Sequence, residues 1–321
     1  MIFTDKASGD KASGDNLISI VIPLYNKESS IRRTLQSVFA QTYRHFEIII
    51  VDDGSTDNSL AVIESFDDSR IRLFKQTNAG VSSARNNGIK YSKGDYIAFL
   101  DADDEWDIDY LERQMELIEH FSECALFSIN YRFKYLDGII GPTIINGLRF
   151  QSETGEMDNY FAVASESNCP ISASSVVIRK NALLSIGGFP IGVTSGEDLL
   201  TWAKLAVGYR ICFDKRPGAT YNIPFAFKCR NAIGRPHDKI DTVGQELEKL
   251  FARHKKIPGL KKYVSFWYRM RASVSLRRGN IDTARNECVK SLGYDMLNLK
   301  TMVIFIISLL PRKFQSLIFN R

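Results

Sequence analysis

The sequence predicts an open, mostly parallel twisted α/β sheet that is flanked by helices and followed by a helical extension. Three observations lead to this fold class. Short apolar runs recur through the first hundred residues, segments with helical spacing separate them, and the pattern becomes wholly helical after Pro236. Strands that alternate with helices pair in parallel, because each crossover returns the chain to the same edge of the sheet. A chain of 321 residues is long enough for one large domain with an appendage.

The first part of the sheet is defined by four apolar runs and the helices between them. The runs that predict strands are Ile18–Pro23, Phe46–Val51, Ile71–Phe74 and Tyr96–Leu100. Their β-branched composition without alternation is typical of strands that are buried on both faces. The segments that predict helices are Glu28–Gln41, Asn58–Ser65 with Asp57 as its cap, a stretch from Val81 to Ile89, and Ile108–His120.

The alternation weakens after Cys124. Strands are predicted at Leu126–Tyr135 and Ser174–Arg179, and Gly138–Glu156 is rich in turn residues and predicts a long loop. Glu197–Val207 predicts a helix that opens with two acids. We therefore divide the chain into a disordered lead-in at 1–16, a main domain at 17–235 with halves at 17–123 and 124–235, and a helical region at 236–321. The polar lead-in lacks the apolar core of a secretory signal.

The charge of the chain is concentrated in its tail. The whole sequence has a net charge of +5, whereas residues 236–321 contain 17 Lys and Arg against 7 Asp and Glu. A basic tail suits an anionic lipid surface. Met296–Leu310 is almost wholly apolar, but it is shorter than the roughly 20 residues that a spanning helix needs. We expect it to lie in a membrane interface; the alternative is a helix that packs on the main domain.

Several classes of protein are disfavoured by what the sequence lacks. Its five cysteines are far apart and form no CxxC pair, which argues against a disulfide framework or a zinc site and favours a reducing compartment. The chain has no G-x-G-x-x-G or Walker loop, which argues against a dehydrogenase or an NTPase. The serines at Ser172–Ser175 lack the G-x-S-x-G context of a hydrolase.

Clustered aspartates follow two of the predicted strands. Asp52 and Asp53 come after Val51, and Asp101-Ala102-Asp103 comes after Leu100. Ligands bind at the carboxyl ends of parallel strands, so both clusters should face one crevice. Carboxylates suit Mg²⁺ or Mn²⁺, which would neutralise a leaving diphosphate. Each cluster alone is better explained by an ordinary turn, and Asp104 or Asp107 could cap the next helix.

Together these motifs resemble the family 2 glycosyltransferases, whose fold is called GT-A. The segments that carry the resemblance are SIVIPLYNKESSIRRTLQSVFAQT (19–42), FEIIIVDDGSTDNS (46–59), NAGVSSARNNGI (78–89), GDYIAFLDADDEW (94–106), GGFP (187–190) and GEDLLTWAKLA (196–206). The resemblance covers about Ile18 to Tyr221. No motif after Pro236 can be carried over.

The resemblance assigns residues to a donor site in the 17–123 half. It implies that Pro23 and Tyr25 flank the nucleobase, and that Asp53 binds the base edge while Asp52 supports the turn. The remaining donor-site residues it implies are Arg85 near the diphosphate, Asp101 in contact with the donor, and Asp103 as the ligand of Mn²⁺ or Mg²⁺.

The resemblance places the acceptor side in the 124–235 half, with Asp198 as the catalytic base and Glu197 among the substrate-binding residues. Chemistry supports the same choice. Displacement at an anomeric carbon needs a carboxylate that takes the proton of the incoming hydroxyl from the side opposite the diphosphate. Such an attack inverts the anomeric centre. Without the resemblance, both acids would be better explained as favourable charges at a helix N-terminus.

The sequence therefore predicts an inverting enzyme that moves a sugar from a UDP-sugar to an acceptor hydroxyl. We expect the acceptor to be a lipid-linked glycan of a surface polysaccharide, such as O-antigen or capsule, and the enzyme to lie on the inner face of the cell membrane. The alternatives are a soluble transferase with a non-lipid acceptor, a sugar-nucleotide nucleotidyltransferase, and a non-catalytic protein on the same fold. Pro23–Ser30 lacks the glycine-rich basic loop of a nucleotidyltransferase. No nucleic-acid partner is expected, and the donor sugar, the linkage and the oligomeric state stay open.

Overall fold

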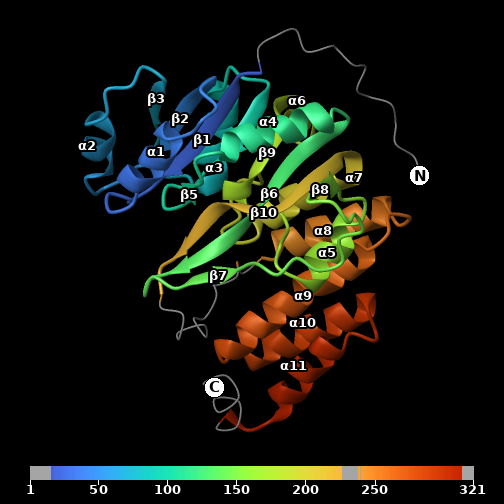
Figure 1. The fold of residues 1–321 in the computed structure, drawn as a ribbon. Coiled ribbons are helices and arrows are strands. Elements are labelled where there is room, and N and C mark those ends of the chain that lie inside the picture. The colour runs from blue at the N-terminus through green and yellow to red at the C-terminus, as the bar shows by residue number, and fades with distance from the viewer. Residues whose placement is uncertain (1–15, 226–237, 239, 313–321) are drawn as a thin grey trace.

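The structure is a computed structural model, and it describes residues 16–225, 238 and 240–312. The lead-in predicted at 1–16 therefore lies outside the described residues, apart from Asn16. Within the described residues, ten strands form one mixed sheet in the order β3-β2-β1-β4-β9-β6-β10-β5, with β7 beside β6 and β8 beside β10 (Figure 1). The predicted fold class is confirmed: an open, mostly parallel sheet with helices on both faces and helices at its C-terminal side.

The first four strands pair in parallel, as the alternation of strands and helices predicts. They are β1 (Ile18–Leu24), β2 (Phe46–Asp52), β3 (Ile71–Lys75) and β4 (Tyr96–Phe99). β1 lies between β2 and β4, so the ends of these three strands meet at one edge. β1 is buried on both faces: Ile20 packs in one hydrophobic core and Val21 in the other. This explains why its sequence shows no alternation of polar and apolar residues.

Four helices connect and cover these strands: α1 (Ile31–Phe39), α2 (Ser59–Glu64), α3 (Val81–Tyr91) and α4 (Tyr110–His120). α1 buries Ile31, Leu35 and Val38, the positions that the helical spacing selects. The Asp57 carboxylate accepts a hydrogen bond from the Ser59 backbone N–H at 3.0 Å, so Asp57 supports the start of α2.

The second half of the sheet departs from simple alternation. Its elements are β5 (Glu105–Trp106), β6 (Cys124–Tyr135), β7 (Ile140–Pro142), β8 (Thr154–Glu156), α5 (Tyr160–Glu166), the 3₁₀ turn η1 (Ala173–Ser175), β9 (Val176–Arg179), α6 (Lys180–Ser185), α7 (Glu197–Gly208) and β10 (Arg210–Ile223). β9 runs antiparallel to both β4 and β6. Gly138–Glu156, for which a loop was predicted, holds the short strands β7 and β8. β10 has no counterpart among the predicted elements.

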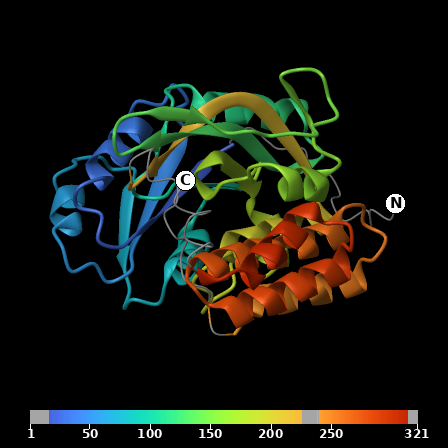
Figure 2. The same cartoon turned by 90° about the horizontal axis from the view of Figure 1, so that it is seen from below.

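The last helices are α8 (Thr242–Arg253), α9 (Leu260–Arg277), α10 (Ile281–Tyr294) and α11 (Leu299–Leu309). α9 packs on α5, and α8 packs on α7. Side chains of α8 and α9, such as Leu247 and Trp267, belong to the same hydrophobic core as Val21 of β1. α10 and α11 follow on the far side of α9, at one end of the molecule (Figures 1 and 2). None of the helices in the described part of the chain is long and apolar enough to cross a bilayer.

Candidate active site

The loops after β1 and β2 are joined to each other by hydrogen bonds. The backbone N–H of Asp53 donates to the carbonyl of Leu24 at 2.8 Å, and that of Asn26 donates to Ser55 Oγ at 3.0 Å. Asn26 has φ +51°, a left-handed conformation that asparagine tolerates better than most residues, and its side chain accepts from Thr56 N–H. This pairing leaves Pro23 half-buried and the ring of Tyr25 exposed at the edge of the sheet.

Asp52 and Asp53 are buried and hold turns. Asp52 Oδ1 accepts from Ser55 N–H at 3.0 Å. Asp53 accepts from the side chain of Gln76 at 2.7 Å and from the backbone N–H groups of Ala79 and Gly80 at 2.8 and 2.9 Å. Its carboxylate therefore fixes the loop that leads into α3. The nucleobase contact expected of Asp53 stays a prediction.

The acidic turn after β4 divides its carboxylates between two environments. Asp101 Oδ1 lies 2.7 Å from the guanidinium of Arg85, and Asp103 forms an ion pair with Lys27. Asp104 is buried and accepts hydrogen bonds from Ser174 Oγ at 2.5 Å and from Asn222 N–H at 3.0 Å. Asp101 and Asp103 are thus the partly exposed carboxylates of the turn, with side-chain exposures of 29% and 36%.

The helix cap considered for Asp104 or Asp107 is wrong. α4 begins after Asp109, which makes no side-chain cap. The Asp104 carboxylate is already satisfied by Ser174 of the turn η1 and Asn222 of β10, and Asp107 pairs with Arg132 of β6. Both acids join segments of the sheet instead of starting a helix.

Arg85 of α3 connects the two acidic segments of the chain. Its guanidinium reaches Asp101 at 2.7 Å and Glu197, at the start of α7, at 3.3 Å. Arg85 is buried, and its guanidinium carbon lies 5.2 Å from the centre of the Phe189 ring. Burial alone would lower the pKa of Arg85, but the nearby carboxylates raise it above its ordinary value. The structure therefore brings the predicted donor-side and acceptor-side acids together around one permanent positive charge.

Glu197 and Asp198 differ in their surroundings. Glu197 is buried, and burial together with the charge of Asp198 raises the pKa of Glu197 to about 7, against the opposing charge of Arg85. Burial also raises the pKa of Asp198. Asp198 is only half-buried, and one of its oxygens accepts from Leu199 N–H at 2.7 Å. Glu197 is thus engaged by Arg85, whereas Asp198 is the less buried residue of the pair.

Helix α9 supports the turn that carries these acids. Gly196 has φ +86°, and a Cβ atom built on it would lie 2.4 Å from the Trp267 ring. The Trp267 indole N–H donates to Asp241 at 3.1 Å, and the Tyr263 hydroxyl donates to the carbonyl of Leu199 at 3.2 Å. Only glycine fits so close to the indole in this conformation. The C-terminal region therefore helps to fix the position of Glu197 and Asp198.

Four further residues belong to this site although the sequence analysis did not single them out: Lys27, Asn86, Ser174 and Asn222. Lys27 follows β1 directly, and as a basic residue opposite two acidic clusters it could have been noticed. Asn86 exchanges two hydrogen bonds of 2.8 Å with the backbone of Phe189. Ser174 donates to Asp104 and also accepts from Asp101 N–H at 3.1 Å, and no local pattern marks it.

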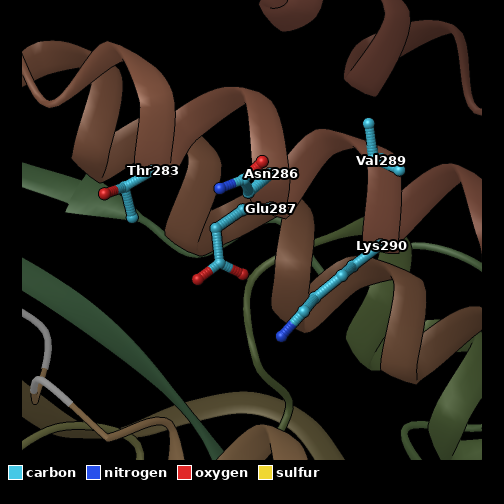
Figure 3. A pocket seen from close by; sticks show the side chains of 5 residues that line it. All are labelled: Thr283, Asn286, Glu287, Val289 and Lys290. Carbon is cyan, nitrogen blue, oxygen red and sulfur yellow. The ribbon is translucent and has the colours of Figure 1, made fainter.

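One cavity lies away from these residues, in the helical region. It has a volume of about 470 Å³ and is lined by residues of α10: Thr283, Asn286, Glu287, Val289 and Lys290 (Figure 3). Figure 3 shows the Glu287 and Lys290 side chains on one side of the helix while Val289 points to the other. Glu287 is paired with Arg271 at 2.9 Å. None of the predicted site residues lines this cavity, so we do not assign it to the donor.

An open α/β sheet with acids at its strand ends, joined through Arg85 to a second acidic pair, is typical of the class of α/β enzymes that bind their ligand at the carboxyl ends of the strands. Comparison with known proteins narrows this class. The family model described as "Glycosyl transferase family 2" matches residues 19–180, just over half of the chain. The chain belongs to this family.

Relatives with curated descriptions agree with the family. An Escherichia coli protein described as "UDP-Glc:alpha-D-GlcNAc-diphosphoundecaprenol beta-1,3-glucosyltransferase WfgD" is 43% identical over 192 residues, which cover 60% of this chain and 70% of that protein. An uncharacterized glycosyltransferase of Rickettsia felis is 34% identical over 198 residues, which cover 60% of this chain and 30% of that protein. The match thus spans less than a third of the Rickettsia relative.

Solved structures share the fold. A crystal structure of residues 1–349 of Staphylococcus aureus TarS superposes with a TM-score of 0.61 at 17% identity, covering 95% of this chain and 92% of that chain. The TarS structure in complex with UDP-GlcNAc gives a TM-score of 0.58 at 18% identity, covering 91% of this chain and 79% of that chain. At this level of identity the likeness supports the fold alone.

Proposed function

We propose that this family 2 glycosyltransferase moves one sugar from a UDP-sugar to a hydroxyl of a lipid-linked glycan, with inversion at the anomeric carbon, in the synthesis of a surface polysaccharide. The observation that carries the proposal is Arg85, whose guanidinium joins Asp101 at the end of β4 to Glu197 at the start of α7. The printed name of WfgD, with its UDP-Glc donor and diphosphoundecaprenol acceptor, supports the choice of substrates.

Asp198 is the proposed base. A carboxylate that takes a proton from an incoming hydroxyl works best when its pKa lies near the working pH, and burial raises the pKa of Asp198 towards that range. Glu197 is held by Arg85, so its role is to position the turn and to keep negative charge beside the base. Attack from the side of Asp198, opposite a diphosphate on the side of Asp101 and Asp103, inverts the sugar.

The donor site is proposed at the ends of β1, β2 and β4. Tyr25 is exposed beside the half-buried Pro23, so a ring and an apolar edge are available to flank a nucleobase. The Asp53 backbone bonds to Leu24 beside them, so its carboxylate would accept a hydrogen bond from a base edge, and Asp52 holds the turn by accepting from Ser55 N–H. Arg85 carries a buried Nε without a hydrogen-bond partner among the described residues, in keeping with a place near a diphosphate.

A divalent cation fits the chemistry of the acidic turn. Asp101 and Asp103 are partly exposed carboxylates two residues apart, and hard oxygen donors of this kind suit Mg²⁺ or Mn²⁺. The described residues contain no group of three or more histidine, cysteine or acidic side chains placed to hold a metal alone, so diphosphate oxygens would complete the coordination. Asp103 would hold the ion, and the ion would neutralise charge on the leaving diphosphate. Lys27 forms an ion pair with the Asp103 carboxylate, and this ion pair would open when Asp103 binds the cation.

The proposed location is the inner face of the cell membrane, where a lipid-linked acceptor presents its glycan, with the protein bound peripherally. A second candidate is a transferase that acts on a non-lipid acceptor, and the same donor chemistry would serve it. The family assignment disfavours the nucleotidyltransferase alternative.

The test is UDP release from a panel of UDP-sugars, with Mn²⁺, with Mg²⁺ and with EDTA. A synthetic α-GlcNAc diphosphate lipid serves as acceptor, and GlcNAc without lipid serves as the comparison. The proposal predicts that one donor is turned over with the lipid-linked acceptor, that EDTA stops the reaction, and that Asp103→Asn and Asp198→Asn are inactive. Turnover of free GlcNAc at an equal rate would favour the second candidate. Full activity of Asp198→Asn would refute the assignment of the base.

A further inference from the structure

Helix α11 lies at the end of the molecule farthest from β1, β2 and β4 (Figure 1). It packs on α9 and α10 and contributes to the outer surface of the helical region (Figure 2). Its eleven residues, Leu299–Leu309, would span roughly 16 Å along the helix axis. That is about half of the hydrocarbon thickness of a bilayer, so α11 cannot cross one.

The inner face of α11 is polar. The buried residues of the helix are Thr301 and Ser308, seven positions apart on one side. Thr301 Oγ1 lies 2.9 Å from Ser291 Oγ, and Arg285 donates to the carbonyl of Ser308 at 2.8 Å. The side chain of Asn298 caps the helix by accepting from Thr301 N–H at 3.1 Å. Hydrogen bonds, more than apolar packing, thus hold α11 against the protein.

The outer face of α11 is apolar. Leu299, Val303 and Ile306 follow one another at the i, i+4, i+7 spacing of a single helix face, and their exposed fractions are 74%, 54% and 59%. Leu309 and the preceding Met296 and Leu297 are also exposed. A helix on the surface of a water-soluble protein normally has the reverse arrangement. A contiguous apolar surface of this kind marks a place where something else binds.

The charge around this face indicates what binds there. Among the described residues from Met296 to Arg312 the charged ones are Lys300 and Arg312, both basic. Lys300 and Arg312 are exposed. An apolar helix face that carries the exposed Lys300 and is followed by the exposed Arg312 suits an interface of acyl chains and anionic headgroups. The same charge would oppose a second copy of this chain on the face.

We propose that the outer face of α11 docks into an anionic membrane interface, with Leu299, Val303 and Ile306 among the acyl chains and Lys300 and Arg312 at the headgroups. The proposal rests on the proposed function and extends it, because it names the surface that brings the enzyme to a lipid-linked acceptor. Its test needs neither donor nor acceptor, so vesicle binding and transferase activity can fail independently.

The experiment is flotation of the full-length protein with vesicles of phosphatidylcholine, with or without phosphatidylglycerol, at low and high salt. Ile306→Glu places a charge in the proposed interface. Leu184→Glu is the matched control, because Leu184 on α6 is also an aliphatic residue with an exposed fraction of 59%. Lys300→Glu tests the charge. Circular dichroism of each variant checks that the helices are intact.

We expect the wild type and Leu184→Glu to float with the anionic vesicles, and Ile306→Glu to partition about tenfold or more weakly. Lys300→Glu should reduce binding roughly fivefold or more at low salt, and less at high salt. Equal flotation of Ile306→Glu and Leu184→Glu would overturn the proposal. So would a wild type that does not float but forms a dimer, in light scattering, that Ile306→Glu abolishes, because the face would then bind a second copy. The proposal would also be overturned if the wild type neither floated nor formed a dimer but bound a protein partner through this face.

Discussion

Replacing Gly196 with alanine should damage both stability and activity, because two separate costs fall on this residue. Its φ of +86° lies in the left-handed region, where a non-glycine residue costs about 1–2 kcal/mol. The new Cβ would also lie 2.4 Å from Trp267 Cη2 and 2.5 Å from Cζ3. Overpacking of this kind costs about 1–3 kcal/mol, whereas the stiffer unfolded chain returns about 0.4–1 kcal/mol. The free energy of unfolding should therefore fall by about 2–4 kcal/mol.

The matched control is Gly279→Ala. Gly279 has φ +78° but nothing within 4 Å of an added Cβ, and it lies in the turn between α9 and α10. It should lose about 1 kcal/mol through its backbone conformation alone and keep its activity. Urea unfolding followed by far-UV circular dichroism measures both variants. The difference between them isolates the contact with Trp267.

The catalytic effect follows from the position of Gly196 next to Glu197 and Asp198. A shift of about 1 Å in a catalytic group can cost on the order of 100-fold in rate, so kcat should fall far more than the affinity for the donor. The double variant with Gly196→Ala and Trp267→Leu should lose less stability than the sum of the two single losses, by a coupling energy of about 1–3 kcal/mol. Equal stability and equal turnover of Gly196→Ala and Gly279→Ala would refute the reasoning.

Two further variants test the charges around the site. Arg85→Met leaves the buried Glu197 carboxylate without its cation, so the free energy of unfolding in urea should fall by about 3–5 kcal/mol. The control Arg149→Met removes an exposed ion pair and should cost about 0–1 kcal/mol. Equal losses in the two variants would contradict the role of Arg85. Burial raises the pKa of Glu197 from 4.5 to about 7 in the folded protein, so the stability from this group is present below pH 4.5 and is lost as the pH rises through 7. The free energy of unfolding of Glu197→Gln, relative to that of the wild type, should therefore be higher at pH 8 than at pH 5. If this relative stability were the same at both pH values, the pKa of Glu197 would not be raised.

Local sequence signals define the first half of the fold well. β1, β2 and β4 are short apolar runs that are buried on both faces, whereas β3 at the edge of the sheet is only partly buried, and the acids after β2 and β4 follow from where those strands end. β10 escapes notice because its fourteen residues include charged residues, a proline and a glycine. Asp214 in this strand is buried, and its charge is satisfied by Arg113 at 2.8 Å and Arg216 at 2.9 Å. Arg113 belongs to a distant helix, so the sequence of β10 does not contain this partner.

The roles of particular acids depend on the same kind of distant contact. Asp104 stands beside Asp103 in the sequence, yet Ser174 and Asn222 bury and satisfy it while Asp103 stays partly exposed. No feature of the local sequence distinguishes Asp103 from Asp104. α11 is a similar case: its apolar composition is plain, but the inward direction of Thr301 follows only from the hydrogen bonds of the folded helices.

The central claim is that Asp198 deprotonates an acceptor hydroxyl opposite the leaving diphosphate. The most direct measurement is the anomeric configuration of the product, read by proton NMR, from an α-linked UDP-sugar with the wild type and with Asp198→Asn. We predict a β-linked product from the wild type and no product from Asp198→Asn, although that variant should still bind UDP in calorimetry. An α-linked product, or a β-linked product formed at the wild-type rate by Asp198→Asn, would contradict the mechanism.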